Sequence, residues 1–345
     1  MTTATDHGTQ DATHDGRTAV AVLGIGSYLP SVVITNDLLA EPAGVTEEWI
    51  LHKTGIETRR AVKADEATSD LALGAARAAL EDAGVKASEL SLIIVGTATP
   101  DVIGPCVASQ VALALEAPRT AGTFDIQAAC AGFLTGISVA QNQLRAAGGY
   151  ALVIGADTYS RFRNPADKRT TALWGDGAGA VVLGPGPADG RGEVIATRLA
   201  SCPVETSVGG IEAGGSRLPA SHETVDAGQH FVRMNGRRIM EIFVENVPPM
   251  VASFLEDTGY RLEDIDHVVP HQGNQRMVEG IPALLGFTRP RLHASAFEYG
   301  NTGSASIPVT LDRAVGRGEI KAGETVLALS IGAGMTFGFV LLRWK

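Results

Sequence analysis

The sequence predicts an α/β fold built from two similar halves, and three internal recurrences support this. Residues 80–95, LEDAGVKASELSLIIV, recur at 255–270 as LEDTGYRLEDIDHVVP, with the Leu, Glu, Asp and Gly residues in step. Residues 133–156 show a helix, a glycine turn and a strand, and residues 307–333 repeat that order. A glycine-rich turn precedes an apolar strand at 175–184 and again at 332–342. Three matches in the same order indicate a duplication.

The elements of the first half alternate as an α/β fold requires. Residues 18–30 are predicted to be a buried strand, 69–84 a helix that ends at a glycine, and 89–99 a second strand. We therefore expect one half at 18–190 and another at 191–345, packed as a unit. Residues 1–17 are polar and are expected to be a disordered tail.

Composition excludes several classes of protein. The chain has 345 residues, which exceeds the roughly 250–300 residues at which a single hydrophobic core stops growing. Two domains, or one duplicated domain, are therefore expected. A content of 45% hydrophobic and 19% charged residues is ordinary for a globular enzyme, and a formal charge of -10 disfavours nucleic-acid binding. The N-terminus lacks the apolar run of a signal peptide or membrane anchor, so a cytoplasmic protein without membrane attachment is expected. Three cysteines without paired spacing predict neither disulfides nor a metal site.

Three polar loops are candidates for the chemistry. They contain Cys130, His271 within VVPHQGNQR, and Asn301 within EYGNTGSAS. Sites in parallel α/β units gather where strands end and lead into helices. Because the first loop belongs to one half and the other two to its partner, a cleft between the halves is expected to collect all three.

Each of the three residues also has an ordinary structural interpretation. Cys130 stands before an expected helix, whose free N–H groups stabilise a thiolate and lower its pKa, but most free cysteines are small buried apolar residues. His271 ends an apolar run, as hydrogen-bonded structural histidines do, and Asn301 lies in a glycine turn that asparagine tolerates. Together, a Cys, a His and an Asn on such loops favour a catalytic set.

Several motifs identify the family that the chain resembles. GIGSYLP, TEEWILHKTGIETRR, AACAGF, WGDGAG, PHQGNQR, GNTGSASIP and GAGMTFG occur in the order typical of β-ketoacyl-acyl-carrier-protein synthase III, a branch of the thiolase-like condensing enzymes. The resemblance implies a thiolase-like fold of two βαβαβαββ halves in αβαβα layers, a homodimer, and no permanently bound cofactor. It implies acyl-CoA and malonyl-acyl carrier protein as substrates.

The resemblance assigns roles to the three candidate residues. Cys130 is the expected nucleophile that takes the acyl group as a thioester. His271 and Asn301 are the expected hydrogen-bond donors to the malonyl thioester carbonyl, where an enolate forms as carbon dioxide leaves. The main-chain N–H groups of Cys130 and Ala333 form the expected oxyanion hole of the acylation step.

Further positions match the CoA and carrier-protein contacts of the family. Trp49 is expected to stack on adenine, Asn274 to contact pantetheine and Arg276 to face the carrier protein. Lys53 and Lys168 stand where arginine is common, so they keep the charge and lose the planar guanidinium. An exposed solvated face is an equally good interpretation of both lysines.

Two positions bear on the size of the acyl group. Gly104 stands where a bulky residue often closes the acyl pocket across the dimer interface, and Trp174 on the opposite side is able to fill that space again. We expect a pocket larger than acetyl needs. The stretch 212–238 is expected to form a flexible border of the acyl channel, and the glycine-rich run 174–184 a tight turn organised by Asp176.

Three functional classes follow. The first is decarboxylative Claisen condensation of a Cys130-bound acyl group with malonyl-carrier protein, in fatty-acid or polyketide initiation. The second is a related acyltransferase that moves the acyl group to a hydroxyl or amine, which Asn301 disfavours because simple transfer needs no enolate stabiliser. The third is a binding subunit without turnover, which the intact set of Cys130, His271 and Asn301 disfavours.

Overall fold

The computed structural model describes residues 19–186, 191–202 and 208–345. The expected tail at residues 1–17 and the end of the first expected half at residue 190 lie outside this range. Within the part of the chain that the structure describes, no helix is long and apolar enough to cross a membrane.

Ten strands form one continuous sheet whose two halves have the same strand order. The order is β12-β11-β13-β14-β8-β1-β7-β6-β4-β5, so each half runs third, second, fourth, fifth and first from its outer edge. The two first strands meet in the middle through a short antiparallel pairing of β1 with β8. The predicted duplicated fold is confirmed. The strands are β1 Val20–Tyr28, β4 Leu90–Gly96, β5 Gly122–Ile126, β6 Tyr150–Thr158, β7 Asp176–Pro185, β8 Gly192–Ser201, β11 His267–Pro270, β12 Arg291–Leu292, β13 Thr325–Gly332 and β14 Thr336–Trp344.

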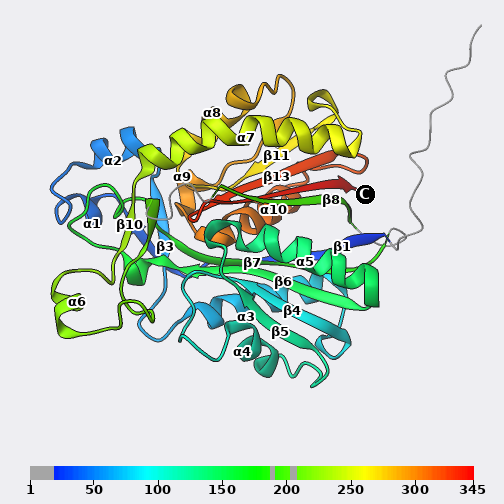
Figure 1. Ribbon diagram of the computed structural model, residues 1–345, viewed down its shortest axis with the longest axis horizontal. Coiled ribbons are helices and arrows are strands. Elements are labelled where there is room, and N and C mark those ends of the chain that lie inside the picture. Colours follow the sequence, from blue (N-terminus) through cyan, green and yellow to red (C-terminus); the bar gives the residue numbers. More distant parts are fainter. Residues whose placement is uncertain (1–18, 187–190, 203–207) are drawn as a thin grey trace, which may run out of the picture.

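The helices and sheet halves alternate in five layers, which are seen edge-on in Figure 1. Helices α3 (Thr68–Ala83) and α4 (Val107–Ala114) cover the outer face of the first half. Helices α7 (Gly236–Thr258) and α8 (Gln275–Leu285) cover the outer face of the second. Between the two sheet halves lie α5 (Gly132–Ala147) and α10 (Ser306–Gly316). This is the αβαβα arrangement that the family resemblance implies.

The recurring sequence stretches occupy the same element in each half. α3 ends at Gly84 and α7 ends at Gly259, both with left-handed φ, at 65° and 74°. Glycine enters this region at little cost, which explains why it ends both helices. Each glycine leads through a short 3₁₀ turn, at Ala87–Glu89 or Leu262–Asp264, into the second strand of its half.

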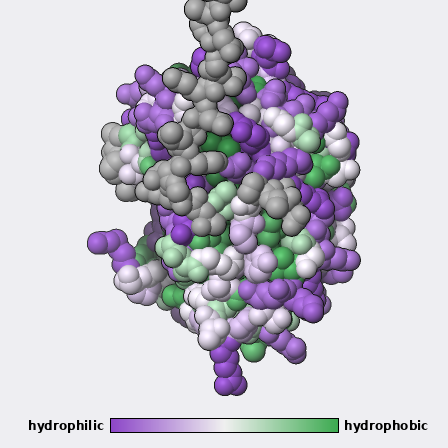
Figure 2. All heavy atoms as spheres, turned by 90° about the vertical axis from the view of Figure 1, so that its right-hand side faces the viewer, coloured by the Kyte–Doolittle hydropathy of each residue, from purple (hydrophilic) through white to green (hydrophobic). Residues whose placement is uncertain are grey.

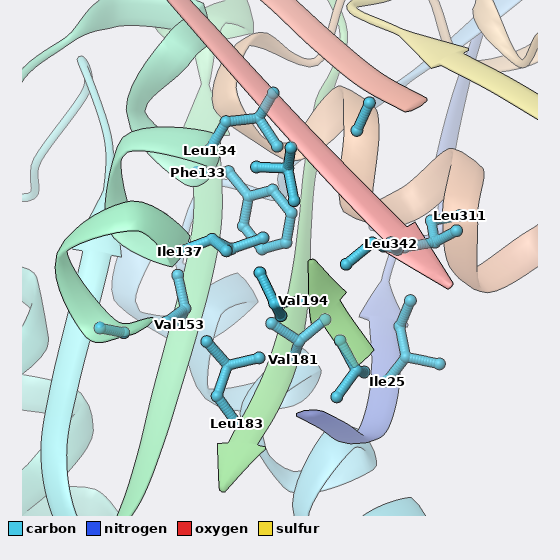
Figure 3. Packing of buried hydrophobic residues seen from close by; sticks show 14 of the residues in the cluster. Ile25, Phe133, Leu134, Ile137, Val153, Val181, Leu183, Val194, Leu311 and Leu342 are labelled. Atoms are coloured by element: carbon cyan, nitrogen blue, oxygen red, sulfur yellow. The ribbon is translucent and has the colours of Figure 1, made fainter. Parts of the chain in front are cut away.

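The central core ties the two halves together around α5. Phe133, Leu134 and Ile137 of α5 are buried in one cluster with Val181 of β7 and Leu342 of β14 (Figure 3). Burying one such side chain contributes about 1.5–3 kcal/mol. Because α5 packs against strands of both halves, its N-terminus is fixed at the boundary between them.

The smaller elements border the sheet. They are β2 Val32–Thr35 and β3 Thr58–Ala61, α1 Asp37–Ala40, α2 Glu47–Thr54, α9 Ala296–Tyr299, and the hairpin β9 Gly209–Ile211 and β10 Val232–Met234 with α6 His222–Asp226 between its strands. Figure 2 views the molecule from the side on which β14 ends, and that face is mainly hydrophilic with apolar residues interspersed. The other end of β14, at Thr336, lies near the site described next.

Candidate active site

One cavity of about 730 Å³ collects the three predicted catalytic residues. Cys130 reaches it from the first half, and His271 and Asn301 reach it from the second. The expectation of a cleft between the halves agrees with this placement. Asn274, Ala333 and Trp174 line the same cavity, with an apolar set formed by Val102, Ile103, Tyr159, Phe162, Ile211, Val232, Met234, Ile239, Met240, Met277 and Ile331.

The backbone around Cys130 is unusual for a helix start. Ala129 has φ 46°, in the left-handed region, and a 3₁₀ turn at Ala129–Ala131 leads into α5. The hydroxyl of Ser330 on β13 donates a hydrogen bond to the Cys130 carbonyl at 2.7 Å. A Cβ atom on Gly332 would lie 2.3 Å from the carbonyl oxygen of Ala128. The second half therefore approaches the nucleophile turn closely, and only glycine permits that approach.

The prediction that the helix end lowers the pKa of Cys130 is wrong for the free protein. Burial raises the pKa of the thiol well above its usual range, and the nearby charge of Asp157 raises it further. The backbone N–H of Cys130 opposes these effects only in part. Desolvation of the charged form therefore outweighs the helix terminus. Cys130 is therefore a neutral thiol in the free protein at physiological pH.

His271 is held as a neutral hydrogen-bond donor. Its residue is 5% exposed, and burial lowers the pKa of the imidazole to about 4. Nδ1 lies 2.8 Å from the hydroxyl of Ser306, which also accepts a hydrogen bond from the N–H of Gln272. When the Ser306 hydroxyl donates to Nδ1, the ring proton lies on Nε2, and this is the tautomer that can donate into the cavity. Gly273, which lines the cavity, lies on the Nε2 side of the ring.

Asn301 is fixed on both its backbone and its side chain. Its N–H donates to the carbonyl of Leu173 at 2.7 Å, and its carbonyl accepts from Gly175 at 3.0 Å, which forms a bridge beside Trp174. Its side-chain oxygen accepts the N–H of Gly303 at 2.9 Å. The amide nitrogen is thus left as the donor toward the cavity. We expected Asn301 to follow a strand, but it follows the short helix α9.

The predicted oxyanion and acyl-pocket residues lie in different surroundings. Ala333 lines the cavity in the turn between β13 and β14. Trp174 is buried in the cavity wall and stacks on Tyr159 with ring centroids 4.1 Å apart. Gly104 is exposed and is not among the lining residues of this single chain, whereas its neighbour Ile103 is. A role for Gly104 across a dimer interface stays a prediction.

Of the residues expected to hold CoA, Asn274 lines the cavity, and Trp49, Lys53 and Lys168 are not among its lining residues. Trp49 and Lys53 are four residues apart on α2, and the Lys168 ammonium lies 6.0 Å from the centre of the Trp49 ring. Asn274 caps α8 by accepting the N–H of Met277 at 2.8 Å. Arg276 is exposed on α8 and pairs with Glu279 at 3.4 Å. Contact of these residues with CoA or a carrier protein stays a prediction.

Two other sequence interpretations are resolved by the fold. The run 174–184 is not the expected tight turn, because Asp176–Pro185 forms strand β7. Asp176, the first residue of that strand, is fully buried and accepts hydrogen bonds from the N–H groups of Val62 and Ser160, which hold the start of β7. The stretch 212–238 borders the cavity, with Ala213, Gly214, Gly215, His230, Val232, Arg233, Met234 and Gly236 among the lining residues.

Sequence reasoning missed the residues that support the catalytic set. Ser306 and Ser330 hold His271 and the Cys130 turn, and Asp157 lies beneath the site at the end of β6. Asp157 carried a signal, since an aspartate closing the apolar run YALVIGAD is unusual for a buried strand. The serines carried none, because a hydroxyl at the first residue of α10 or within β13 does not by itself indicate a contact with His271 or Cys130.

Comparisons with known proteins match nearly the whole chain to one family. The family description "3-Oxoacyl-[acyl-carrier-protein (ACP)] synthase III" matches residues 124–203, and its C-terminal counterpart matches residues 255–344. The chain is 43% identical to Acetoacetyl CoA synthase NphT7 of Streptomyces sp. (strain CL190), over 94% of this chain and 98% of the relative. It is 40% identical to a β-ketoacyl-[acyl-carrier-protein] synthase III of Caldanaerobacter subterraneus subsp. tengcongensis, over 95% and 98%.

A solved structure shows the same fold over the same extent. The 3-oxoacyl-(acyl carrier protein) synthase III of Pseudomonas aeruginosa PAO1 superimposes with a TM-score of 0.85 at 34% identity. The match covers 95% of this chain and 98% of that one.

Proposed function

Because the chain belongs to the β-ketoacyl-acyl-carrier-protein synthase III family and is a condensing enzyme of that kind, we propose the following residue roles. Cys130 accepts an acyl group from acyl-CoA, and the acyl-enzyme then condenses with a malonyl thioester. The main evidence for these roles is that the Cys130 thiol and two neutral hydrogen-bond donors, His271 and Asn301, line one cavity. These three groups match the two half-reactions of a decarboxylative condensation.

In the first half-reaction the Cys130 sulfur attacks the thioester carbonyl of acyl-CoA. The thiol proton leaves with the CoA sulfur, so a thioester replaces a thioester and no net proton is consumed. The oxygen that becomes negative in this step is expected to meet the N–H groups of Cys130 and Ala333. Because the free thiol has a raised pKa, the sulfur must lose its proton during the attack and not before it.

In the second half-reaction the malonyl thioester loses carbon dioxide and its carbonyl becomes an enolate. Nε2–H of His271 and the amide nitrogen of Asn301 donate to this oxygen. Because the pKa of His271 is about 4, the ring is neutral at physiological pH and stabilises the enolate without protonating the attacking carbon. The carbon then attacks the Cys130 thioester and releases a β-ketoacyl thioester and the Cys130 thiolate, which takes up a proton from solvent.

The form in which the malonyl group arrives defines a second candidate. An acidic carrier protein needs exposed basic residues, but near the cavity Arg276 pairs with Glu279 and Arg233 pairs with Glu212. The relative from Streptomyces is named for a CoA product. These observations favour malonyl-CoA as an alternative donor, with a β-ketoacyl-CoA as the product.

Intact-protein mass spectrometry of wild type and Cys130→Ala tests these roles. Acyl-CoAs of two to eight carbons are added first, and malonyl-carrier protein or malonyl-CoA second. We expect an acyl mass on wild type alone, followed by its loss as a β-ketoacyl product and carbon dioxide form. An acyl mass that moves only to an alcohol or amine acceptor would contradict condensation. The ratio of kcat/KM for the two malonyl donors decides between the carriers.

The expected homodimer is also part of this proposal. Ile103 is 92% exposed and Leu113 is 81% exposed, both beside the edge of the first half. Large exposed apolar side chains of this kind are typical of association surfaces. Light scattering on the purified protein measures the mass, and a monomer at micromolar concentration would contradict the dimer. The expected cytoplasmic location stays a prediction.

A further inference from the structure

We propose that Asp157 is a positioning residue for decarboxylation. Its carboxylate binds the turn that orients Asn301 and joins this turn to the loop after β4. This inference rests on the proposed condensation. Asp157 is fully buried near the end of β6, and the chemistry described above does not use it.

The carboxylate of Asp157 connects the two halves of the chain. One oxygen, Oδ1, accepts from the hydroxyls of Thr97 and Thr99 at 3.1 and 2.9 Å and from the N–H of Ala98 at 2.8 Å. These three residues follow β4 in the first half. The other oxygen, Oδ2, accepts the N–H of Ser304 in the second half at 2.7 Å. A single side chain therefore fixes a loop from each half.

The turn held by Asp157 is the one that orients Asn301. The N–H of Gly303 donates to the Asn301 side-chain oxygen, and the next N–H, of Ser304, donates to Asp157. Gly303 has φ 57°, and a Cβ atom there would lie 2.2 Å from Asp157 Oδ2. The turn is thus packed directly on the carboxylate. Moving Ser304 would move Gly303, and with it the bond that sets the direction of the Asn301 amide.

Two acceptor oxygens are needed at this position. An asparagine could accept from the loop after β4 with its one oxygen, but its NH₂ group would then face the N–H of Ser304. The carboxylate satisfies both sides, although its burial raises its own pKa to about 6 and its charge raises that of Cys130. This charge disfavours the Cys130 thiolate while it holds the turn of Asn301, so we assign its role to the other half-reaction.

The test is Asp157→Asn, with the two half-reactions measured separately. Acyl loading from acyl-CoA is followed by intact mass, and release of carbon dioxide from malonyl thioester is followed on the acyl-enzyme. We expect loading within about 3-fold of wild type and decarboxylation reduced by about 10²-fold, the loss typical of a misdirected donor. Alkylation of Cys130 by iodoacetamide at pH 8 should become faster, because the buried negative charge near the thiol is gone.

The matched control is Asp125→Asn. Asp125 is a partly buried carboxylate of the first half, whereas Asp157 is fully buried. Like Asp157 it accepts backbone N–H groups, those of Val107 and Ala108 at 2.8 Å each, at the start of α4. It does not line the cavity. We expect both half-reactions and the alkylation rate to stay at the wild-type level in this variant.

Two results with Asp157→Asn overturn the inference. If this variant decarboxylates like wild type, the turn does not need the carboxylate. If both half-reactions slow equally, Asp157 is only structural. Should that variant fail to fold, Thr97→Val removes one donor from the same carboxylate, and it must slow decarboxylation but not loading. Wild type that releases no carbon dioxide refutes the proposed function itself, which is distinguishable from the first two results.

Discussion

Replacing Gly332 with alanine tests whether the close approach of the two halves positions the nucleophile. The new Cβ would lie 2.3 Å from the Ala128 carbonyl oxygen, 2.6 Å from the Thr336 hydroxyl and 3.2 Å from the Ala131 nitrogen. Ordinary contact begins at 3.4 Å, so the end of β13 and the Cys130 turn must separate by about 1 Å. Ala333, the expected oxyanion donor, follows directly and would move with it.

This displacement has a cost in rate and a cost in stability. A shift of 1 Å in a reacting group lowers the rate by about 10²-fold, and overpacking of this kind destabilises by about 1–3 kcal/mol. We therefore expect Gly332→Ala to load acyl-CoA about 10²-fold more slowly, measured by the time course of the acyl mass. Urea unfolding should show a reduced free energy of unfolding.

Gly280→Ala is the matched control for the same chemical change. Gly280 lies inside α8, its φ is not in the left-handed region, and a Cβ there meets no atom within 4 Å. Alanine is favoured over glycine in a helix by about 1 kcal/mol, so this variant should be slightly more stable and load normally. If Gly332→Ala loads acyl-CoA at the wild-type rate, the contact between the halves does not set the geometry of the nucleophile.

Three further predictions follow from the site. Iodoacetamide should alkylate Cys130 in the free enzyme with a rate that still rises above pH 9, and a plateau below pH 8 would show that its pKa is not raised. The pKa of His271 is about 4 when folded and 6.5 when unfolded, so the unfolded state binds more protons between these values and stability falls as the pH drops from 6.5 to 4. The loss is at most about 3 kcal/mol, and urea unfolding of His271→Asn should show a flatter pH dependence than wild type. Trp49→Ala should raise KM for acyl-CoA about 10-fold and leave loading from a short acyl thioester without adenine unchanged. Equal losses with both substrates would show that the Trp49 indole does not contact the adenine.

The duplicated fold and the common location of Cys130, His271 and Asn301 were predictable because both leave local patterns. The repeat at 80–95 and 255–270 survives as identical helix ends, since a left-handed glycine and a polar turn are required in both halves. Cys130, His271 and Asn301 stand in short motifs that fix their places next to turns. Their gathering in one cavity followed from the topology of the strands.

What could not be predicted depends on burial and long-range contacts. The acidity of Cys130 is set by desolvation and by Asp157, which lies 27 positions further along the chain and reaches the site only through the sheet. Likewise, the hydrogen bond between His271 and Ser306 joins the loop after β11 to the first residue of α10, and no sequence pattern indicates that these two positions meet. Gly104 was assigned from the family pattern of a dimer, and a single chain leaves it on the surface.

The strand order shared by the two halves also shows how they have diverged. The turn at Ala129–Ala131 that precedes α5 has its counterpart in the turn at Gly303–Ala305 that precedes α10. The thiol of Cys130 therefore corresponds to the hydroxyl of Ser304, a buried group that makes no hydrogen bond to the described residues. The turn of the first half opens into the cavity, whereas the turn of the second half is bound by Asp157. The second half therefore contributes His271 and Asn301 to the site and no second nucleophile at the position of Ser304.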